Sequence, residues 1–191
     1  VYQNVNTDCF RPKVSDASNY NPKDVLLVSR MHKAIAIILF KLEGQIVLRN
    51  PAFQMTDRLL LDKIDYKKKE IAIDGVTYPL SDTEFPTVNP QNPYQLSPEE
   101  SELMSQLRFS FQQSEKLQRH AKFLYSKGGL YACCNGNLLF HGCIPMNMDE
   151  SFMAFEINGE KLTGKRFLDY AESVARQGYY AKPGSPERQL G

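Results

Sequence analysis

The longest regular pattern of apolar and polar positions lies at 23–43, KDVLLVSRMHKAIAIILFKLE, and predicts a helix that ends at Gly44. At about 100° per residue, one side of this helix carries a basic stripe and nearly all the rest is apolar. The stripe consists of Lys23, Arg30, Lys33 and Lys41. We interpret it first as a solvated face, with a ridge facing phosphate groups as the alternative.

Four further segments have helical patterns. They are 55–64 (MTDRLLLDKI), a segment from Ser97 (SPEESELMSQL), 111–126, and 164–178, which Gly178 closes. The second of these has a clear start signal. Ser97 is the predicted cap, Pro98 stands at the first helical position, and Glu100 falls where a capping box needs it.

Three Asx-Gly pairs between apolar runs predict β-hairpins: Asp74-Gly75, Asn135-Gly136 and Asn158-Gly159. Both strands around Asn135-Gly136 are apolar at consecutive positions, so we expect both faces of that hairpin to be covered. GQIVLRNP (44–51) predicts a short strand, and the three prolines of 82–96 predict an extended connector. Helices and hairpins mix without β-α-β alternation, which indicates the α+β class.

Composition is that of an ordinary soluble domain. The 191 residues are 42% hydrophobic and 24% charged, with a formal net charge of +1, so nothing indicates a nucleic-acid partner. No apolar run reaches the length of about 18 residues that a membrane span needs. The four cysteines form no regular framework, and we expect reduced thiols in the cytoplasm. Because the chain opens on Val1 and stops in a Pro/Gly loop, we expect it to be cut from a longer protein.

The stretch YACCNGNLLFHGCIP (131–145) carries the strongest chemical signal. His141 ends a predicted strand, directly before Gly142, and could be a metal ligand, part of a thiol site, or an ordinary boundary histidine. A zinc site formed with Cys133, Cys134 and Cys143 lacks the usual ligand spacing. His32 and His120 lie on predicted helices, and we assign them no role.

Long stretches of the chain resemble class III fructose-1,6-bisphosphatase, the bacterial calcineurin-like type. The resemblance runs over most of 9–152 and rests on HKAIAIILFKLEGQI (32–46), DTEFPTVNPQNPYQL (82–96), SEKLQRHAKFLYSKG (114–128) and NLLFHGCIP (137–145), among others. It implies a piece of an αββα metallophosphatase sandwich, with 1–127 as a helix and hairpin elaboration and 128–191 as part of the core.

The resemblance also implies a function: hydrolysis of the 1-phosphate of fructose 1,6-bisphosphate in gluconeogenesis, with two Mn²⁺ ions. His141 would be one metal ligand, and Lys33, Lys41, Arg49 and Arg58 would be candidates for the second phosphate. The family's other metal motifs are missing from this sequence, so we expect most ligands to lie outside it and the chain by itself to be inactive. The implied partner is a small sugar bisphosphate, and we expect neither a nucleic acid nor a membrane as partner. Whether the enzyme is a homo-oligomer is left open.

Two other interpretations remain. The chain could be a non-catalytic regulatory or oligomerisation module of the same enzyme. It could also be a relative of the protein phosphatases, although Cys143 stands where those proteins have a second glycine.

Overall fold

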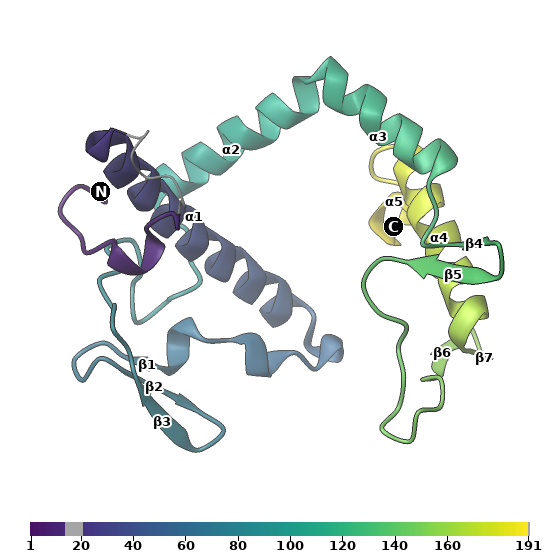
Figure 1. Ribbon diagram of the computed structural model, residues 1–191, viewed down its shortest axis with the longest axis horizontal. Coiled ribbons are helices and arrows are strands. Elements are labelled where there is room, and N and C mark those ends of the chain that lie inside the picture. The colour runs from purple at the N-terminus through teal and green to yellow at the C-terminus, as the bar shows by residue number, and fades with distance from the viewer. Residues whose placement is uncertain (14–20, 191) are drawn as a thin grey trace. The chain divides into compact units, whose positions relative to one another are not determined.

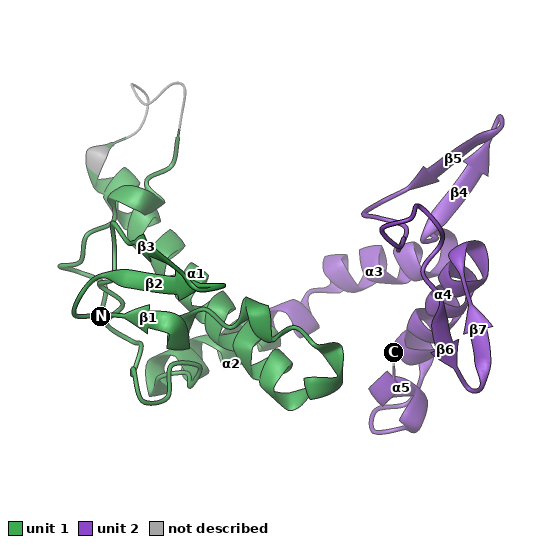
Figure 2. Ribbon diagram, turned by 90° about the horizontal axis from the view of Figure 1, so that it is seen from below, with its two compact units in different colours: residues 1–109 green, residues 110–191 purple. Residues whose placement is uncertain are grey.

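The computed structural model describes residues 1–13 and 21–190, and the chain divides into two compact units, Val1–Phe109 and Ser110–Gly191 (Figure 2). The division falls inside helix α2 (Pro98–Gln113), whereas the sequence-based domains meet at 127/128. Assignment of 1–127 to an elaboration and 128–191 to a phosphatase core stays a prediction. Both units mix helices with small antiparallel sheets, so the α+β class is confirmed.

Helix α1 (Pro22–Arg49) is the longest element of the first unit (Figure 1). Its cap is Asn21, whose side chain accepts a hydrogen bond from the Lys23 N–H. The helix runs through Gly44, so the predicted end there and the predicted strand at 44–51 are both wrong. The glycine serves packing instead, because a Cβ at Gly44 would lie 2.1 Å from Cδ1 of Tyr94. Only glycine lets the tyrosine ring lie directly against the helix backbone.

Three short 3₁₀ turns follow α1: η3 (Pro51–Phe53), η4 (Thr56–Arg58) and η5 (Leu61–Lys63). The helix predicted at 55–64 is therefore wrong. Leu59 is extended, and Leu59 and Leu61 are both buried in the core with Val47 and Tyr94. Apolar contacts two residues apart suit an extended backbone rather than a helix, and here the tertiary contact overrides the leucine-rich helical pattern.

A three-stranded antiparallel sheet completes the first unit, in the order β1 (Ile64–Asp65), β2 (Glu70–Ile73) and β3 (Val76–Pro79). The predicted hairpin at Asp74-Gly75 is confirmed, with φ of 50° and 80° at the two turn residues. The connector 81–97 has no helix, as its prolines predicted, and leads to α2. The predicted capping box at the start of α2 is also confirmed, because Ser97 Oγ accepts from Glu100 N–H and Glu100 Oε2 accepts from Ser97 N–H.

The second unit holds helix α3 (Glu115–Lys127), two hairpins, helix α4 (Gly164–Tyr180) and the short α5 (Pro186–Leu190). Ser114 caps α3 through the Leu117 N–H, so this helix starts later than the predicted residue 111, and α4 continues two residues past Gly178. The hairpins are β4 (Tyr131–Cys134) with β5 (Asn137–Phe140), and β6 (Phe155–Ile157) with β7 (Glu160–Leu162). Both predicted turns are confirmed. The expectation of covered faces at β4–β5 is wrong within the described residues, because almost every residue of these strands is exposed.

Candidate functional site

Strand β5, which closes the β4–β5 hairpin in Figure 1, ends at Phe140, and His141 is the next residue. The Asn135-Gly136 turn has positive φ at both residues, 50° and 76°, which is the geometry of a tight type I′ hairpin. Pairing of Cys134 with Asn137 and of Tyr131 with Phe140 then fixes the strand register up to the histidine. The His141 side chain is exposed, and the next residue, Gly142, has φ of 91°, which favours glycine. The sequence thus presents an imidazole to solvent at a sharp exit from the hairpin.

Helix α4 anchors the hairpin at the end that carries His141. The Tyr131 hydroxyl donates to Oδ1 of Asp169 at 2.7 Å, and the Lys165 ammonium donates to Oδ2 of the same carboxylate at 2.5 Å. The Lys165 contact and then the Tyr131 contact hold the pKa of Asp169 below its ordinary value. Because Tyr131 pairs with Phe140, the residue before His141, this contact anchors the strand end from which His141 projects.

The described residues of the chain do not by themselves form a metal site. Among residues 1–13 and 21–190, no three or more His, Cys, Asp and Glu side chains gather closely enough to hold an ion. Cys133, Cys134 and Cys143 are exposed and form no disulfide, as is also true of Cys9. One imidazole supplies one ligand, whereas a catalytic site needs at least three protein ligands in most zinc enzymes and more in two-metal sites. His141 therefore fits a metal site only if other ligands come from elsewhere.

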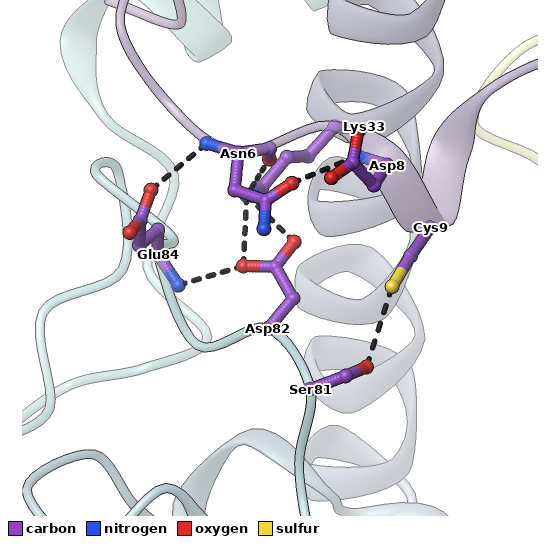
Figure 3. A network of polar contacts seen from close by, with 7 residues as sticks. All are labelled: Asn6, Asp8, Cys9, Lys33, Ser81, Asp82 and Glu84. Carbon is purple, nitrogen blue, oxygen red and sulfur yellow. Dashed lines mark hydrogen bonds and ion pairs between the residues drawn. The ribbon is translucent and has the colours of Figure 1, made fainter.

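Lys33 is fully buried, which overturns its interpretation as part of a solvated face. Its ammonium group donates to both carboxylate oxygens of Asp82, at 2.8 and 3.0 Å, and to the Asn6 carbonyl at 2.7 Å (Figure 3). The rings of Phe10 and Phe85 lie 5.8 and 5.5 Å from the nitrogen, within range of a cation–π interaction. Lys33 thus attaches both the N-terminal segment and the connector to α1.

Lys41, two helical turns further along, is also fully buried, and its solvated-face interpretation is likewise wrong. Its ammonium donates to Glu100 Oε2 at 2.7 Å and to the Thr87 carbonyl at 2.6 Å. The same Glu100 oxygen accepts the Ser97 N–H of the capping box. One carboxylate therefore caps α2 and neutralises a buried lysine on α1.

The remaining two phosphate candidates lie at or just beyond the C-terminal end of α1. Arg58 forms a partly exposed ion pair with Glu43, with Nε and Oε1 2.5 Å apart. Arg49 is exposed in the last turn of α1 and forms no ion pair with the described residues. Both arginines belong to the first unit, whereas His141 belongs to the second.

Asp82 and Glu43 were missed by the sequence-based interpretation, and Glu100 was recognised only as a cap. No local signal marks Asp82 as the partner of Lys33, since 49 residues separate the two along the chain. The clue that the sequence did offer was local: Lys33 and Lys41 directly flank the apolar run Ala34–Phe40, and lysines in such a setting invite a search for buried carboxylates.

Comparison with known proteins identifies the family. The sequence model of the Firmicute fructose-1,6-bisphosphatases matches residues 1–190. This chain belongs to that family. Two similar proteins are the class 3 fructose-1,6-bisphosphatases of Clostridium beijerinckii, 48% identical over 190 residues, and of Listeria innocua, 46% identical over 189 residues. The alignments cover 100% and 99% of this chain but only 29% of each relative.

A third member of the family, the class 3 fructose-1,6-bisphosphatase of Clostridium novyi, is 48% identical over 190 residues, and the chain covers 28% of its length. No solved structure matches the chain. Among residues 1–13 and 21–190, no helix combines the length and the apolar content needed to cross a bilayer.

Proposed function

We propose that this chain is part of a longer hydrolase that converts fructose 1,6-bisphosphate to fructose 6-phosphate and phosphate, a step of gluconeogenesis. The observation that carries the proposal is the alignment of essentially the whole chain, at 46–48% identity, with proteins named class 3 fructose-1,6-bisphosphatase. A soluble phosphorylated sugar is a substrate of cytoplasmic metabolism, so we assign the enzyme to the cytoplasm.

We further propose that His141 is one ligand of a two-metal Mn²⁺ site in a calcineurin-like core. Its exposed imidazole at a strand end supports this role, as does the anchoring of the hairpin to α4 through Tyr131. Paired metal ions activate a bound water and hold phosphate oxygens for in-line attack, and imidazole is an acceptable ligand for such metals. The other ligands would come from parts of the longer protein outside these 191 residues.

For the second phosphate of the substrate, we propose Arg49 and Arg58 ahead of Lys33 and Lys41. Guanidinium groups bind phosphate oxygens through two parallel hydrogen bonds. Arg49 is exposed, and the Arg58 ion pair is open to solvent. By contrast, each buried lysine already donates to a carboxylate and to a carbonyl, so binding a phosphate would first break those contacts.

The test is His141→Ala in the longer protein. Loss of one ligand should weaken Mn²⁺ binding and lower turnover of fructose 1,6-bisphosphate by about 10²-fold or more, since a misplacement of about 1 Å alone can cost that much. Thermal stability should change little, because the side chain is exposed. Steady-state phosphate release during a Mn²⁺ titration measures both effects.

His32→Ala and His120→Ala are the matched controls, since both histidines are exposed on helices. Both should retain turnover within about tenfold of the wild type. If His141→Ala keeps the wild-type turnover and metal dependence, the ligand role is wrong. If the wild-type longer protein releases no phosphate from the bisphosphate, the proposed activity itself is wrong.

A further inference from the structure

Helix α1 buries a mixed face of polar and apolar residues and leaves most of another apolar face exposed. The buried positions are Ser29, Lys33, Ile37, Ile38, Lys41, Gly44 and Val47. The opposite face carries what we call the apolar stripe: Val28, Met31, Ile35, Leu39, Leu42 and Ile46. Successive spacings of three or four residues place these six side chains within about 80° of one another, at about 100° per residue. The stripe runs for about 27 Å along the helix at 1.5 Å per residue.

Most of the stripe is open to solvent in the structure. Met31 is 61% exposed and Leu39 is 59% exposed, and Leu42 is the one member that is half-buried. Continuous apolar surface of this length is uncommon on a free-standing soluble domain and marks a contact surface. The ion pairs of Lys33 and Lys41 fix this orientation, because a helix turned to bury the stripe would have to break both of them.

We infer that the apolar stripe is an internal interface of the longer enzyme, covered by the part of the same polypeptide that lies outside these 191 residues. This inference rests on the proposal that the chain is part of a longer phosphatase, but on no detail of its reaction. More than two thirds of the length of the relatives lies outside the aligned region, which provides ample chain to cover the stripe.

A second apolar surface in the other unit favours this occupant over a second copy of the chain. The β4–β5 hairpin exposes Leu138, Leu139 and Phe140, which are consecutive and therefore point to alternate faces. An isolated two-stranded hairpin is marginal in water, so both of its faces need cover. A two-fold contact between copies joins one patch on each chain to its equivalent. The remainder of a much longer polypeptide can cover the stripe and both hairpin faces.

The charge pattern of α1 argues against a lipid surface as the occupant. Helices that lie on membranes place lysines and arginines where these can reach lipid headgroups. Here Lys33 and Lys41 are buried on the side opposite the stripe and are held by carboxylates. The helix therefore lacks the two central cations that would hold it on an anionic bilayer.

Methionine oxidation tests the inference on the wild-type longer protein. Peroxide oxidises methionine according to its exposure, and peptide mapping reads each site separately. If the stripe is covered, Met31 should oxidise about tenfold or more slowly in the folded longer protein than in urea. The control is a methionine placed in the polar β1–β2 turn by Lys68→Met, a position 72% exposed, which should oxidise equally fast in both states. Oxidation of Met31 at the same rate as this control in the folded protein overturns the inference.

A charged substitution in the stripe then distinguishes cover by the rest of the same polypeptide from cover by a second copy. With the polypeptide itself as occupant, Leu39→Glu should lower the melting temperature of the longer protein by several degrees without changing its sedimentation mass. Leu39→Met, which conserves volume, should leave both unchanged. A fall in mass accompanied by exposure of Met31 would assign the stripe to a second copy and overturn the inference. If Leu39→Glu fails to fold, the wild-type oxidation rates still decide between covered and uncovered.

Enzyme activity is a separate readout. A longer protein that protects Met31 but releases no phosphate supports the interface and rejects the proposed function. A longer protein that is active but leaves Met31 reactive rejects the interface alone.

Discussion

Replacing Lys41 with methionine would leave a carboxylate buried without its counter-ion. Lys41 is fully buried and Glu100 is 5% exposed, with Nζ and Oε2 2.7 Å apart. Methionine fills much of the same volume but removes the charge and the hydrogen bond to the Thr87 carbonyl. The second oxygen of Glu100, Oε1, is buried and has no hydrogen-bond partner among the described residues, so no alternative contact is in place to compensate.

The expected loss of stability in Lys41→Met is set by the cost of keeping the Glu100 carboxylate buried without a counter-ion. Breaking a buried ion pair by removing one partner costs about 3–5 kcal/mol. Protonating an ordinary glutamic acid at pH 7 costs about 3.7 kcal/mol, so this route limits the penalty to about the same size. A loss of about 3 kcal/mol corresponds to a fall of roughly 6–12 °C in melting temperature for a chain of this size.

The double variant Lys41→Met/Glu100→Gln shows how much of the stability loss comes from the unpaired charge of Glu100. Glutamine keeps an acceptor for the Ser97 N–H but carries no charge, so it should restore most of the stability that the single variant loses. Lys165→Met removes a lysine from an exposed ion pair with Asp169 and serves as the matched control, with no measurable loss expected.

Hydrogen exchange of the α1 amides reports the stability of the first unit, and exchange of the α4 amides reports that of the second. If Lys41→Met costs no more than Lys165→Met, or if the double variant is as unstable as the single one, the ion pair does not stabilise the fold as argued.

Three further predictions concern the first unit and the chain by itself. Gly44→Ala should destabilise the first unit by about 1–3 kcal/mol in hydrogen exchange, since the new Cβ would lie 2.1 Å from the Tyr94 ring and the overlap outweighs a helix-propensity gain of about 1 kcal/mol; an unchanged or higher stability would show that the ring moves freely. Burial, and then the hydrogen bond to Asp62, raises the pKa of Tyr94, so its protonated form contributes stability below about pH 10 that is lost as pH rises further. Between about pH 9 and 11, Tyr94→Phe should therefore lose less stability than the wild type does. Parallel pH profiles of the two proteins would contradict this. Finally, the 191-residue chain should release no phosphate from fructose 1,6-bisphosphate at millimolar Mn²⁺, because the described residues supply no metal-binding cluster, and metal-dependent turnover by the purified chain would contradict this assignment.

Local chemistry in the sequence predicted the hairpin turns and the cap at Ser97 correctly, but not the helix ends at Gly44 and Gly178. All three Asx-Gly hairpins and the capping box of Ser97 and Glu100 form as predicted, because each depends on a few adjacent residues. Predictions that depended on distant partners failed. Gly44 ends no helix because Tyr94, fifty residues further along, packs against it, and the leucines at 59 and 61 lie in a core that no window of ten residues reveals.

The orientation of α1 shows why the candidate site was harder to predict than the fold. The periodicity correctly separated a basic stripe from an apolar face, but periodicity alone does not state which face is inside. The usual assumption, that apolar residues point into the body and lysines into water, holds for a complete domain. Here Asp82 on the connector and Glu100 on α2 each pair with an inward-pointing lysine, and the apolar stripe is left facing outward.

The surroundings of His141 are likewise built only in part by this chain. Its strand, its turn and its anchor on α4 are all built by residues of this chain, within about forty positions of one another. The groups that would complete a metal site are not among the described residues. A hairpin with two exposed apolar faces and a helix with an exposed apolar stripe both require covering surface, and a lone metal-type histidine requires further ligands. All three requirements are met at once if the rest of a longer polypeptide packs against both units. Protection of Met31 from oxidation and the metal dependence of turnover in His141→Ala therefore test this packing by independent routes.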